Sequence, residues 1–341
     1  MVKKALFIIT IFFILIIEII LRVFPSDGYQ RNFYERSRNI IQYNDEYVQY
    51  DSLLGYRLKP SLDITHFNTE FYTPVKTNKY GQRDDSSNSA DVLFLGDSHF
   101  FGWGVEINER LDKIYTKSKQ ITSYNLVMSG YSTIQSILSF EQYIKHNKAP
   151  EKVFFCVFPN DIQENRSWGA YPYVRNEQEQ EFGRQQEFGV VSIEDYNLWR
   201  EITQDYMNGF WTKNSRILDL LKVNYRNLSN YNGKQSERVN ASKPFDQENN
   251  YTKAFEYCFK YLTEKYPNIQ IHLLLLPDKS SAIENIDHDH LKLARKVLDS
   301  YSCSIIDLKE VLDSDDYFEL DDHINKTGHA TIAQYLINEA F

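Results

Sequence analysis

The chain is short of cysteine and of positive charge, and both shortages narrow what it can be. Its 341 residues include only three cysteines, Cys156, Cys258 and Cys303, each within an apolar run. Buried free thiols fit that placement better than a disulfide framework does. Lysine and arginine number 38 against 47 acidic residues, which gives a net charge of −9. An acidic chain is a poor ligand for nucleic acid, so we expect no nucleic-acid partner.

Internal repeats are also missing, and so is a complete set of metal ligands. The run Asp287-His288-Asp289-His290 has residue types that bind metals. Adjacent residues at a helix start point in different directions, however, and no cysteine or third distant histidine completes the set. The sequence therefore predicts neither a metal site nor another cofactor.

Hydrophobic residues are concentrated at the N-terminus. Residues 5–24 form an almost unbroken apolar segment of about the 20 residues that cross a bilayer. Lys3 and Lys4 precede this segment and no small-residue cleavage site follows it, which favours an uncleaved signal anchor. Arg22 weakens the charge asymmetry, and Glu18 is expected to reach the membrane interface. We expect a single-pass membrane protein that contacts lipid through residues 5–24, with the rest extracytoplasmic, in the periplasm or at the cell surface.

A short apolar strand ends in Gly-Asp-Ser at residues 96–98, just before a predicted helix. Gly96 permits a sharp turn, so we expect Ser98 at the carboxyl edge of a sheet, near helix amides that favour negative charge. Developing oxyanions need such surroundings. The tripeptide alone is a weak signal, and a turn that only caps a helix is an equal alternative.

The C-terminal run 318–330, FELDDHINKTGHA, supplies two further groups for serine chemistry. A nucleophilic serine needs a base that takes its proton, and the base needs a carboxylate that fixes its tautomer. His323 and Asp321 have these chemical types in a predicted loop before the last helix. Chain order does not determine whether His323 reaches Ser98 in space.

Two more turns follow buried-looking strands. Residues 124–128 run into Ser129-Gly130, where glycine presents a bare backbone N–H, and residues 153–158 run into Pro159-Asn160-Asp161. Open α/β sheets collect their ligand groups at the carboxyl ends of their strands. We therefore expect these turns at the same edge as Ser98.

These four blocks, in this order, resemble the SGNH, or GDSL-like, hydrolase family over roughly residues 90–341. The matching blocks are GDS at 96–98, Gly130, Asn160 and DDH at 321–323. The resemblance implies a catalytic triad of Ser98 as nucleophile, His323 as base and Asp321 as its orienting partner. It also implies an oxyanion hole made by the amides of Ser98 and Gly130 and the side chain of Asn160.

The last block departs from the family pattern. Many members separate the aspartate from the histidine by two residues, whereas here Asp321 is one residue away and Asp322 is adjacent. Leu320 occupies the usual aspartate position and cannot serve. We prefer Asp321 over Asp322 as the orienting carboxylate.

Three polar residues near these blocks receive ordinary interpretations. His99 follows the serine directly in a starting helix, so its side chain is expected to point away from the hydroxyl. Asp97 is interpreted as a turn or network residue. His329 lies at the start of the last helix, where a surface or capping role is expected.

From residue 90 on, apolar strands alternate with helix-like segments, which predicts a parallel sheet in an α/β fold. The predicted strands cover residues 92–95, 124–128, 153–158, 270–276 and 303–307. The predicted helices cover residues 132–146, 249–265, 285–300 and 327–340, the last with Asn325 as N-cap. The family resemblance makes this a three-layer, flavodoxin-like fold of the SGNH hydrolase type.

The predicted domain organisation has three parts: a transmembrane anchor at 1–24, an extension and linker at 25–89, and a catalytic domain at 90–341. The extension contains LGYRLKP at 54–60 and TNKYGQR at 77–83, which alternate like short strands; membrane-anchored SGNH-like proteins often carry a similar preface. The catalytic domain carries an insertion at 163–247. The aromatic residues that follow Asn160 could line the pocket or pack internally: Trp168, Tyr171 and Tyr173.

The leading functional hypothesis is a membrane-tethered serine esterase that forms a covalent acyl-enzyme. The resemblance implies O-acyl groups, mainly O-acetyl, on an extracytoplasmic carbohydrate, or another small ester. A sugar hydroxyl in place of water would make the enzyme an O-acyltransferase. A catalytically silent glycan-binding or assembly subunit of an envelope polysaccharide machinery is the alternative from another class. A metal-dependent hydrolase ranks last.

Overall fold

The computed structural model describes residues 2–84, 89–161, 214–231, 250–284 and 303–339, together with residues 193, 194, 196, 197, 200, 292, 295, 296 and 301. The chain divides into two compact units. One comprises Met1–Arg38 and Leu198–Lys243, and the other comprises Asn39–Asn197 and Pro244–Phe341. The predicted boundaries after residues 24 and 89 stay predictions.

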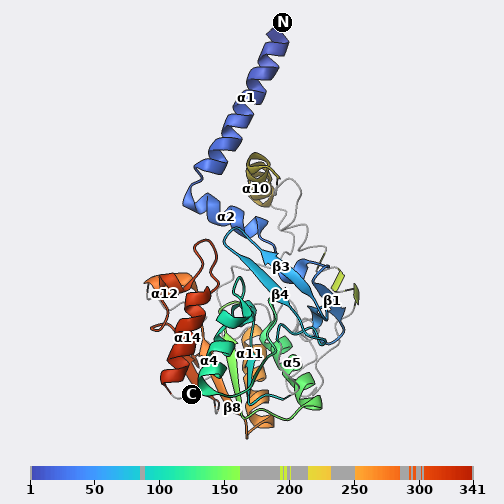
Figure 1. Ribbon diagram of the computed structural model, residues 1–341. Helices are drawn as coiled ribbons and strands as arrows, with labels where there is room; N and C mark the ends of the chain where they lie inside the picture. Colours follow the sequence, from blue (N-terminus) through green and yellow to red (C-terminus); the bar gives the residue numbers. More distant parts are fainter. Residues whose placement is uncertain are drawn as a thin grey trace. The chain divides into compact units, whose positions relative to one another are not determined.

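The first unit contains three described helices, α1 (Val2–Val23), α2 (Asp27–Ser37) and α10 (Arg216–Tyr231) (Figure 1). Within the described part of the chain, α1 alone is long and apolar enough to cross a membrane, with a mean hydropathy of 2.8 and no buried residue. Length and composition are what this finding rests on, and a signal sequence has the same properties. The helix therefore matches residues 5–24 of the sequence without fixing a topology.

Glu18 of α1 contacts the start of α10. Its carboxylate accepts hydrogen bonds from the backbone N–H groups of Arg216 at 2.8 Å and Ile217 at 3.1 Å, and from the Ser215 hydroxyl at 3.0 Å. Arg22, one turn along α1, donates to the same carboxylate at 2.8 Å. The first N–H groups of a helix lack partners within it, so Glu18 acts as a cap supplied by another helix.

The second unit is built on a five-stranded parallel sheet. Its strands are β5 (Val92–Leu95), β6 (Ser123–Asn125), β7 (Lys152–Val157), β8 (Gln270–Leu275) and β9 (Ser304–Asp307). They lie in the order β6-β5-β7-β8-β9 and every pairing is parallel. Counted along the chain this order is 2-1-3-4-5, the flavodoxin-like arrangement. The predicted α/β class is confirmed.

Helices cover both faces of the sheet. Helix α4 (Leu111–Lys119) packs against α14 (Lys326–Asn338), and α5 (Thr133–His146) packs against α11 (Asn250–Lys265) (Figure 1). The chain steps one way from β5 to β6 and the other way afterwards, so right-handed crossovers place α4 and α5 on opposite faces. Strands covered on both faces read as continuous apolar runs, as the fully buried VLFL of β5 does.

Predicted and observed elements differ mainly at their ends. The strand predicted at 124–128 stops at Asn125, whose side chain accepts the Val127 N–H at 3.0 Å and so forms a turn directly after the strand. Asn325 caps α14 as predicted, since its side chain accepts the N–H groups of Thr327 and Gly328. Helix α4 was not predicted, and most of the helix predicted at 285–300 lies outside the described residues.

Two antiparallel hairpins precede the sheet in the second unit. One pairs β1 (Val48–Asp51) with β2 (Gly55–Leu58), and the other pairs β3 (Asp63–Phe67) with β4 (Tyr72–Lys76). The short strands predicted in the extension are thus present. The three cysteines are free; Cys156 and Cys258 are buried and Cys303 is half-buried.

Candidate active site

Ser98 lies in a sharp turn whose backbone requires glycine at position 96. At Gly96 φ is 135°, and a Cβ built there would lie 2.6 Å from the Cβ of Cys156 on the neighbouring strand β7. The chain therefore turns sharply after β5, and Ser98 becomes the first residue of the short helix α3 (Ser98–Phe101). Asp97 caps this helix by accepting the His99 N–H at 3.1 Å. The serine is 8% exposed at the carboxyl edge of the sheet.

His323 hydrogen-bonds to both Ser98 and Asp321. Its Nε2 lies 2.6 Å from the Ser98 Oγ, and its Nδ1 lies 2.5 Å from the Asp321 Oδ1. A carboxylate only accepts hydrogen bonds, so an ionised Asp321 fixes the ring proton on Nδ1 and leaves the Nε2 lone pair facing the serine hydroxyl. The fold thus brings together, from segments 225 residues apart in the chain, a hydroxyl, an imidazole and a carboxylate.

Asp322, the alternative orienting residue, lies farther from the ring. Its Oδ1 is 3.8 Å from the His323 Nδ1 and its side chain is 54% exposed, whereas the side chain of Asp321 is fully buried. Asp321 also accepts the backbone N–H of His323 at 3.1 Å. This double contact holds the loop in a tight turn around the carboxylate. The geometry therefore favours Asp321 over Asp322 as the residue that orients His323.

Two backbone bonds close the base of the loop that carries Asp321 and His323. The N–H of Phe318 donates to the carbonyl of His323 at 3.0 Å, and the N–H of Asn325 donates to the carbonyl of Asp316 at 2.8 Å. The capped start of α14 follows directly. Three residues before α14 begins, the imidazole has little freedom to leave the serine.

Gly130 and Asn160 follow β6 and β7, the two neighbours of β5 in the sheet. Gly130 has φ 74°, and a Cβ there would lie 2.9 Å from the Tyr56 hydroxyl. Burial raises the pKa of Asp97 to about 6, and the nearby side-chain amide of Asn160 works against this rise. Both residues therefore lie at the carboxyl edge that carries Ser98.

Two aromatic rings stack on the imidazole of His323. The Trp103 ring centroid is 4.9 Å away with planes 20° apart, and that of His99 is 4.6 Å away with planes 28° apart. The ring of His99 therefore packs against His323, a contact that the sequence did not predict, and its orientation away from the Ser98 hydroxyl stays a prediction. Trp103 was missed because the one-turn helix α3 ends at Gly102 with φ 79°, which folds the chain back toward the serine.

The surface position expected as one alternative for His329 is wrong. Its side chain is completely buried where α14 packs on α4, and its Nδ1 accepts the Leu111 N–H at 3.3 Å. Burial lowers the pKa of His329 to about 3, so the ring is neutral at physiological pH. The residue belongs to the helix contact and supplies a cap for the start of α4.

A buried arginine from the extension holds the turn that follows α3. Arg83 donates to the carbonyls of Phe101 and Gly102 at 2.8 Å and to that of Val105 at 2.6 Å. Burial, with the positive charge of Arg110 nearby, lowers the pKa of Arg83 to about 9. The TNKYGQR segment noted in the sequence therefore ends on a residue that satisfies the free carbonyls at the end of α3.

Within the described residues, one acidic group has the spacing of metal ligands: ligand atoms of Asp321, Asp322 and His323 lie within 4.8 Å of one another. Both nitrogens of the His323 ring are already hydrogen-bonded, so a metal there would have to displace Asp321 or Ser98. The run Asp287 to His290 lies outside the described residues, as do Trp168, Tyr171 and Tyr173.

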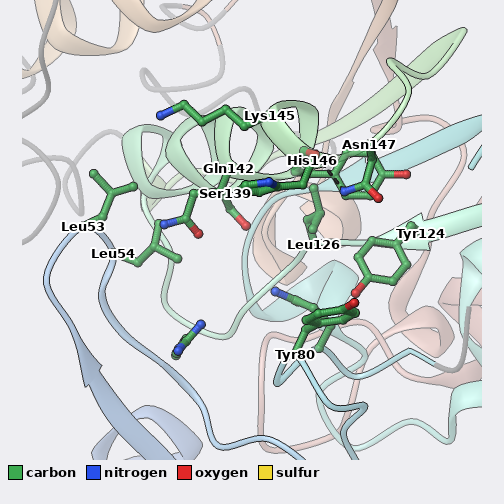
Figure 2. Close-up of a pocket in the computed structure, with 13 residues that line it drawn as sticks. Leu53, Leu54, Tyr80, Tyr124, Leu126, Ser139, Gln142, Lys145, His146 and Asn147 are labelled. Carbon is green, nitrogen blue, oxygen red and sulfur yellow. Dashed lines mark hydrogen bonds between the residues drawn. The ribbon is translucent and has the colours of Figure 1, made fainter. Parts of the chain in front are cut away.

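The second unit also has a cavity of about 670 Å³ that none of the residues hydrogen-bonded to His323 lines. Figure 2 shows its lining, which comes from the β1–β2 hairpin, the segment around Tyr80, and α5. Tyr124 and Tyr143 stack within this lining, with ring centroids 5.5 Å apart. The cavity is therefore separate from the serine site.

No protein-family model and no curated protein matches the sequence. Solved structures that match include a protein described as a lipolytic protein of the G-D-S-L family from Desulfitobacterium hafniense DCB-2, at 12% identity and a TM-score of 0.38, covering 74% of this chain and 99% of that one. An acetyl xylan esterase from Butyrivibrio proteoclasticus matches at 10% identity and a TM-score of 0.35, covering 75% and 65%. A family two carbohydrate esterase from Clostridium thermocellum matches at 11% and 0.35, covering 73% and 62%. The chain is thus similar, at low identity, to G-D-S-L-type lipolytic proteins and carbohydrate esterases.

Proposed function

We propose that this chain is a membrane-tethered serine hydrolase of the SGNH type, an esterase that removes O-acyl groups from carbohydrate. The observation that carries the proposal is the hydrogen-bonded line from Ser98 through His323 to Asp321 at the carboxyl edge of the sheet. A buried serine hydroxyl bonded to an imidazole that is itself held by a carboxylate is the arrangement that activates serine for attack on a carbonyl.

In the proposed reaction, the Ser98 Oγ attacks the ester carbonyl while the Nε2 of His323 takes the hydroxyl proton. Asp321 stabilises the imidazolium that forms. The tetrahedral intermediate collapses, the bond to the alcohol breaks, and His323 gives its proton to the leaving oxygen. Water then attacks the acyl-enzyme by the same route in reverse and releases the acid.

The oxyanion of the intermediate needs preorganised donors. We assign these to the backbone N–H groups of Ser98 and Gly130 and to the side-chain amide of Asn160. The side-chain amide of Asn160 lies near Asp97, whose pKa it lowers. A carboxamide carries two N–H donors, and one of them would serve the oxyanion.

The proposed substrate is an O-acyl, mainly O-acetyl, group of an extracytoplasmic carbohydrate, with envelope polysaccharide machinery as the setting. This follows from the family that the four sequence blocks resemble. Helix α1 would tether the enzyme to the bilayer, with Lys3 and Lys4 on the cytoplasmic side. A sugar hydroxyl that replaces water in the second step would make the same triad an O-acyltransferase.

The test is intact-protein mass spectrometry after incubation of the full-length protein with an acetyl donor ester, with and without candidate glycans. An esterase shows a transient acetyl adduct that water discharges, and a transferase discharges it faster when a glycan is added. The variant Ser98→Ala should carry no adduct. A folded wild-type protein that never forms an adduct, yet binds glycan, would instead favour the silent binding subunit.

A further inference from the structure

The loop that carries Asp321 and His323 is held by a residue far away in the sequence. Glu70 lies in the turn between β3 and β4, and its Oε1 accepts the backbone N–H of Leu320 at 3.0 Å. Lys279 donates to the carbonyls of Phe318 at 2.6 Å and Glu319 at 2.9 Å. The backbone just before Asp321 is thus held by a carboxylate at an N–H group and by an ammonium at two carbonyls.

The same hairpin reaches the imidazole through Trp103. The ring of His66, on β3, lies edge-on to Trp103 at 4.6 Å between centroids, and the ring of Phe71 does so at 5.9 Å. Phe71 also contacts Phe318 of the catalytic loop, with centroids 5.4 Å apart. Trp103 in turn stacks on His323, so a continuous set of rings joins the hairpin to the catalytic base.

The environment of this contact makes the charged forms of Glu70 and His66 unfavourable. Burial raises the pKa of Glu70, and the negative charge of Asp321 raises it further. Burial lowers the pKa of His66 to about 4, so this ring is neutral and donates its Nε2–H to the carbonyl of Asn39 at 2.7 Å. A half-buried carboxylate beside a second carboxylate does little for stability on its own, which points to a role in the site.

We propose that the β3–β4 hairpin positions His323 for catalysis by two routes. Glu70 of the hairpin holds the loop that carries His323, and Trp103, against which the hairpin packs, holds the imidazole ring. Glu70 holds the loop so that Asp321 and His323 keep their places relative to Ser98. Trp103 holds the plane of the imidazole and stabilises its protonated form through the face of the indole. This inference rests on the proposed function of the Ser98 site.

The two contacts act at different moments of the reaction. The loop must be in place before attack, because displacement of a catalytic group by about 1 Å can cost about a hundredfold in rate. The indole face matters once His323 carries the serine proton, since the face of an aromatic ring attracts a cation, and does so more strongly in a desolvated site. Glu70 therefore affects the position of His323, and Trp103 affects the stability of its protonated form.

Several ionisable side chains other than Glu70 also face His323. Those that contact the ring or act on it through charge are Asp321, Asp322, Asp97, His99 and His66. The two neighbouring histidines have lowered pKa values, so they stay neutral near pH 7. An altered pH profile in a Trp103 variant that retains these groups therefore reports on the indole.

The first test compares Glu70→Ala, which removes the acceptor, with Glu70→Gln, which keeps an oxygen at the same place. Asp63→Ala is the matched control, because it removes a carboxylate from the same hairpin whose exposed ion pair with Lys76 lies outside the site. In the full-length protein, kcat and KM for p-nitrophenyl acetate and the thermal midpoint would be measured.

We expect Glu70→Ala to lose about tenfold or more in kcat with little change in KM or thermal midpoint, and Glu70→Gln and Asp63→Ala to stay within about threefold of wild type. A folded Glu70→Ala protein with kcat within twofold of wild type would overturn the proposal. If Glu70→Ala does not fold, Glu70→Asp, whose carboxylate is one methylene short of Leu320, gives the same decision from its kcat.

The second test compares Trp103→Leu with Trp103→Phe. Loss of the aromatic face destabilises the imidazolium, so the acidic limb of the kcat/KM profile should shift to lower pH in Trp103→Leu, and kcat should fall. Phenylalanine should restore most of both. An unchanged limb in Trp103→Leu would contradict the role of the indole. If wild type itself neither turns over esters nor forms a Ser98 adduct, the proposed function fails and not this inference alone.

Discussion

The turn after β5 and the β3–β4 hairpin both serve His323, but they do so by different physical means. The turn supplies the proposed reacting atom, the Ser98 Oγ, from a backbone bent sharply at Gly96 and Gly102. The hairpin supplies no proposed reacting atom; its turn carries Glu70 and Phe71, and its strand β3 carries His66. Both sets of groups thus lie largely on turns, but glycines shape the turn that carries Ser98, whereas two paired antiparallel strands present the turn that carries Glu70.

The largest effect should come from the reacting atom itself. Ser98→Ala removes the nucleophile without disturbing α3, so ester turnover should fall by about 10³-fold or more. Circular dichroism and the thermal midpoint should stay those of wild type. Retained turnover at a tenth of wild type would show that the hydroxyl is not the nucleophile.

Substitution of Asp321 and of Asp322 should have sharply different effects on kcat. Asp321→Asn leaves the shape of the side chain but fixes the wrong tautomer of His323, and a loss of about 10³- to 10⁴-fold in kcat is expected. Asp322→Asn alters an exposed carboxylate 3.8 Å from the ring and should change kcat by less than about threefold. The reverse order, measured by steady-state kinetics, would move the orienting role to Asp322.

The sharp turn itself should be sensitive to a single methyl group. Gly96→Ala places a Cβ against the Cβ of Cys156 and forces an alanine to φ 135°, which should lower the free energy of unfolding by about 2 kcal/mol or more. Gly28→Ala in α2, where nothing lies within 4 Å, is the control and should not destabilise. Chemical denaturation of both variants measures the difference.

Much of the serine site could be predicted from the sequence because each part has a local signature. Gly96-Asp97-Ser98 follows an apolar strand, which predicts Ser98 at the carboxyl edge of a sheet, and Asp321-x-His323 lies in a predicted loop before a capped helix. Their approach in space depends on the parallel strand order, which alternating strands and helices imply.

The roles of Glu70, Trp103 and His329 had no such signature. Glu70 meets the catalytic loop 250 residues away, and the position of Trp103 depends on the exact length of α3. His329 follows a glycine at a helix start, a pattern typical of exposed positions, and its burial depends on α4, a nine-residue helix that was not predicted. Contacts between distant segments decide these roles, and local pattern does not report them.

His329 makes the stability of the second unit depend on pH. Its pKa is 6.5 in the unfolded chain and about 3 when folded, so between these values the unfolded state binds more protons. Stability should therefore fall as the pH drops from about 6.5 toward 3, by up to about 1.4 kcal/mol per pH unit for this residue. In His329→Gln, denaturation curves should show a shallower slope over that range, whereas the exposed His146→Gln should keep it. An unchanged slope in His329→Gln would contradict the neutral buried ring.

The smallest effect expected is that of metal removal. Because the His323 nitrogens are engaged by Asp321 and Ser98, incubation with EDTA should leave ester turnover within about a factor of two of the untreated enzyme. Loss of activity on chelation, with recovery on adding a divalent cation, would revive the metal-dependent hydrolase.

The central claim is that Ser98 is an activated nucleophile. A fluorophosphonate probe followed by peptide mass spectrometry measures this directly, because the probe phosphonylates serines that a base activates. The account predicts one labelled site, Ser98, in the folded full-length protein, and no label in His323→Ala. A folded wild-type protein that stays unlabelled, or that is labelled at another serine, would contradict it.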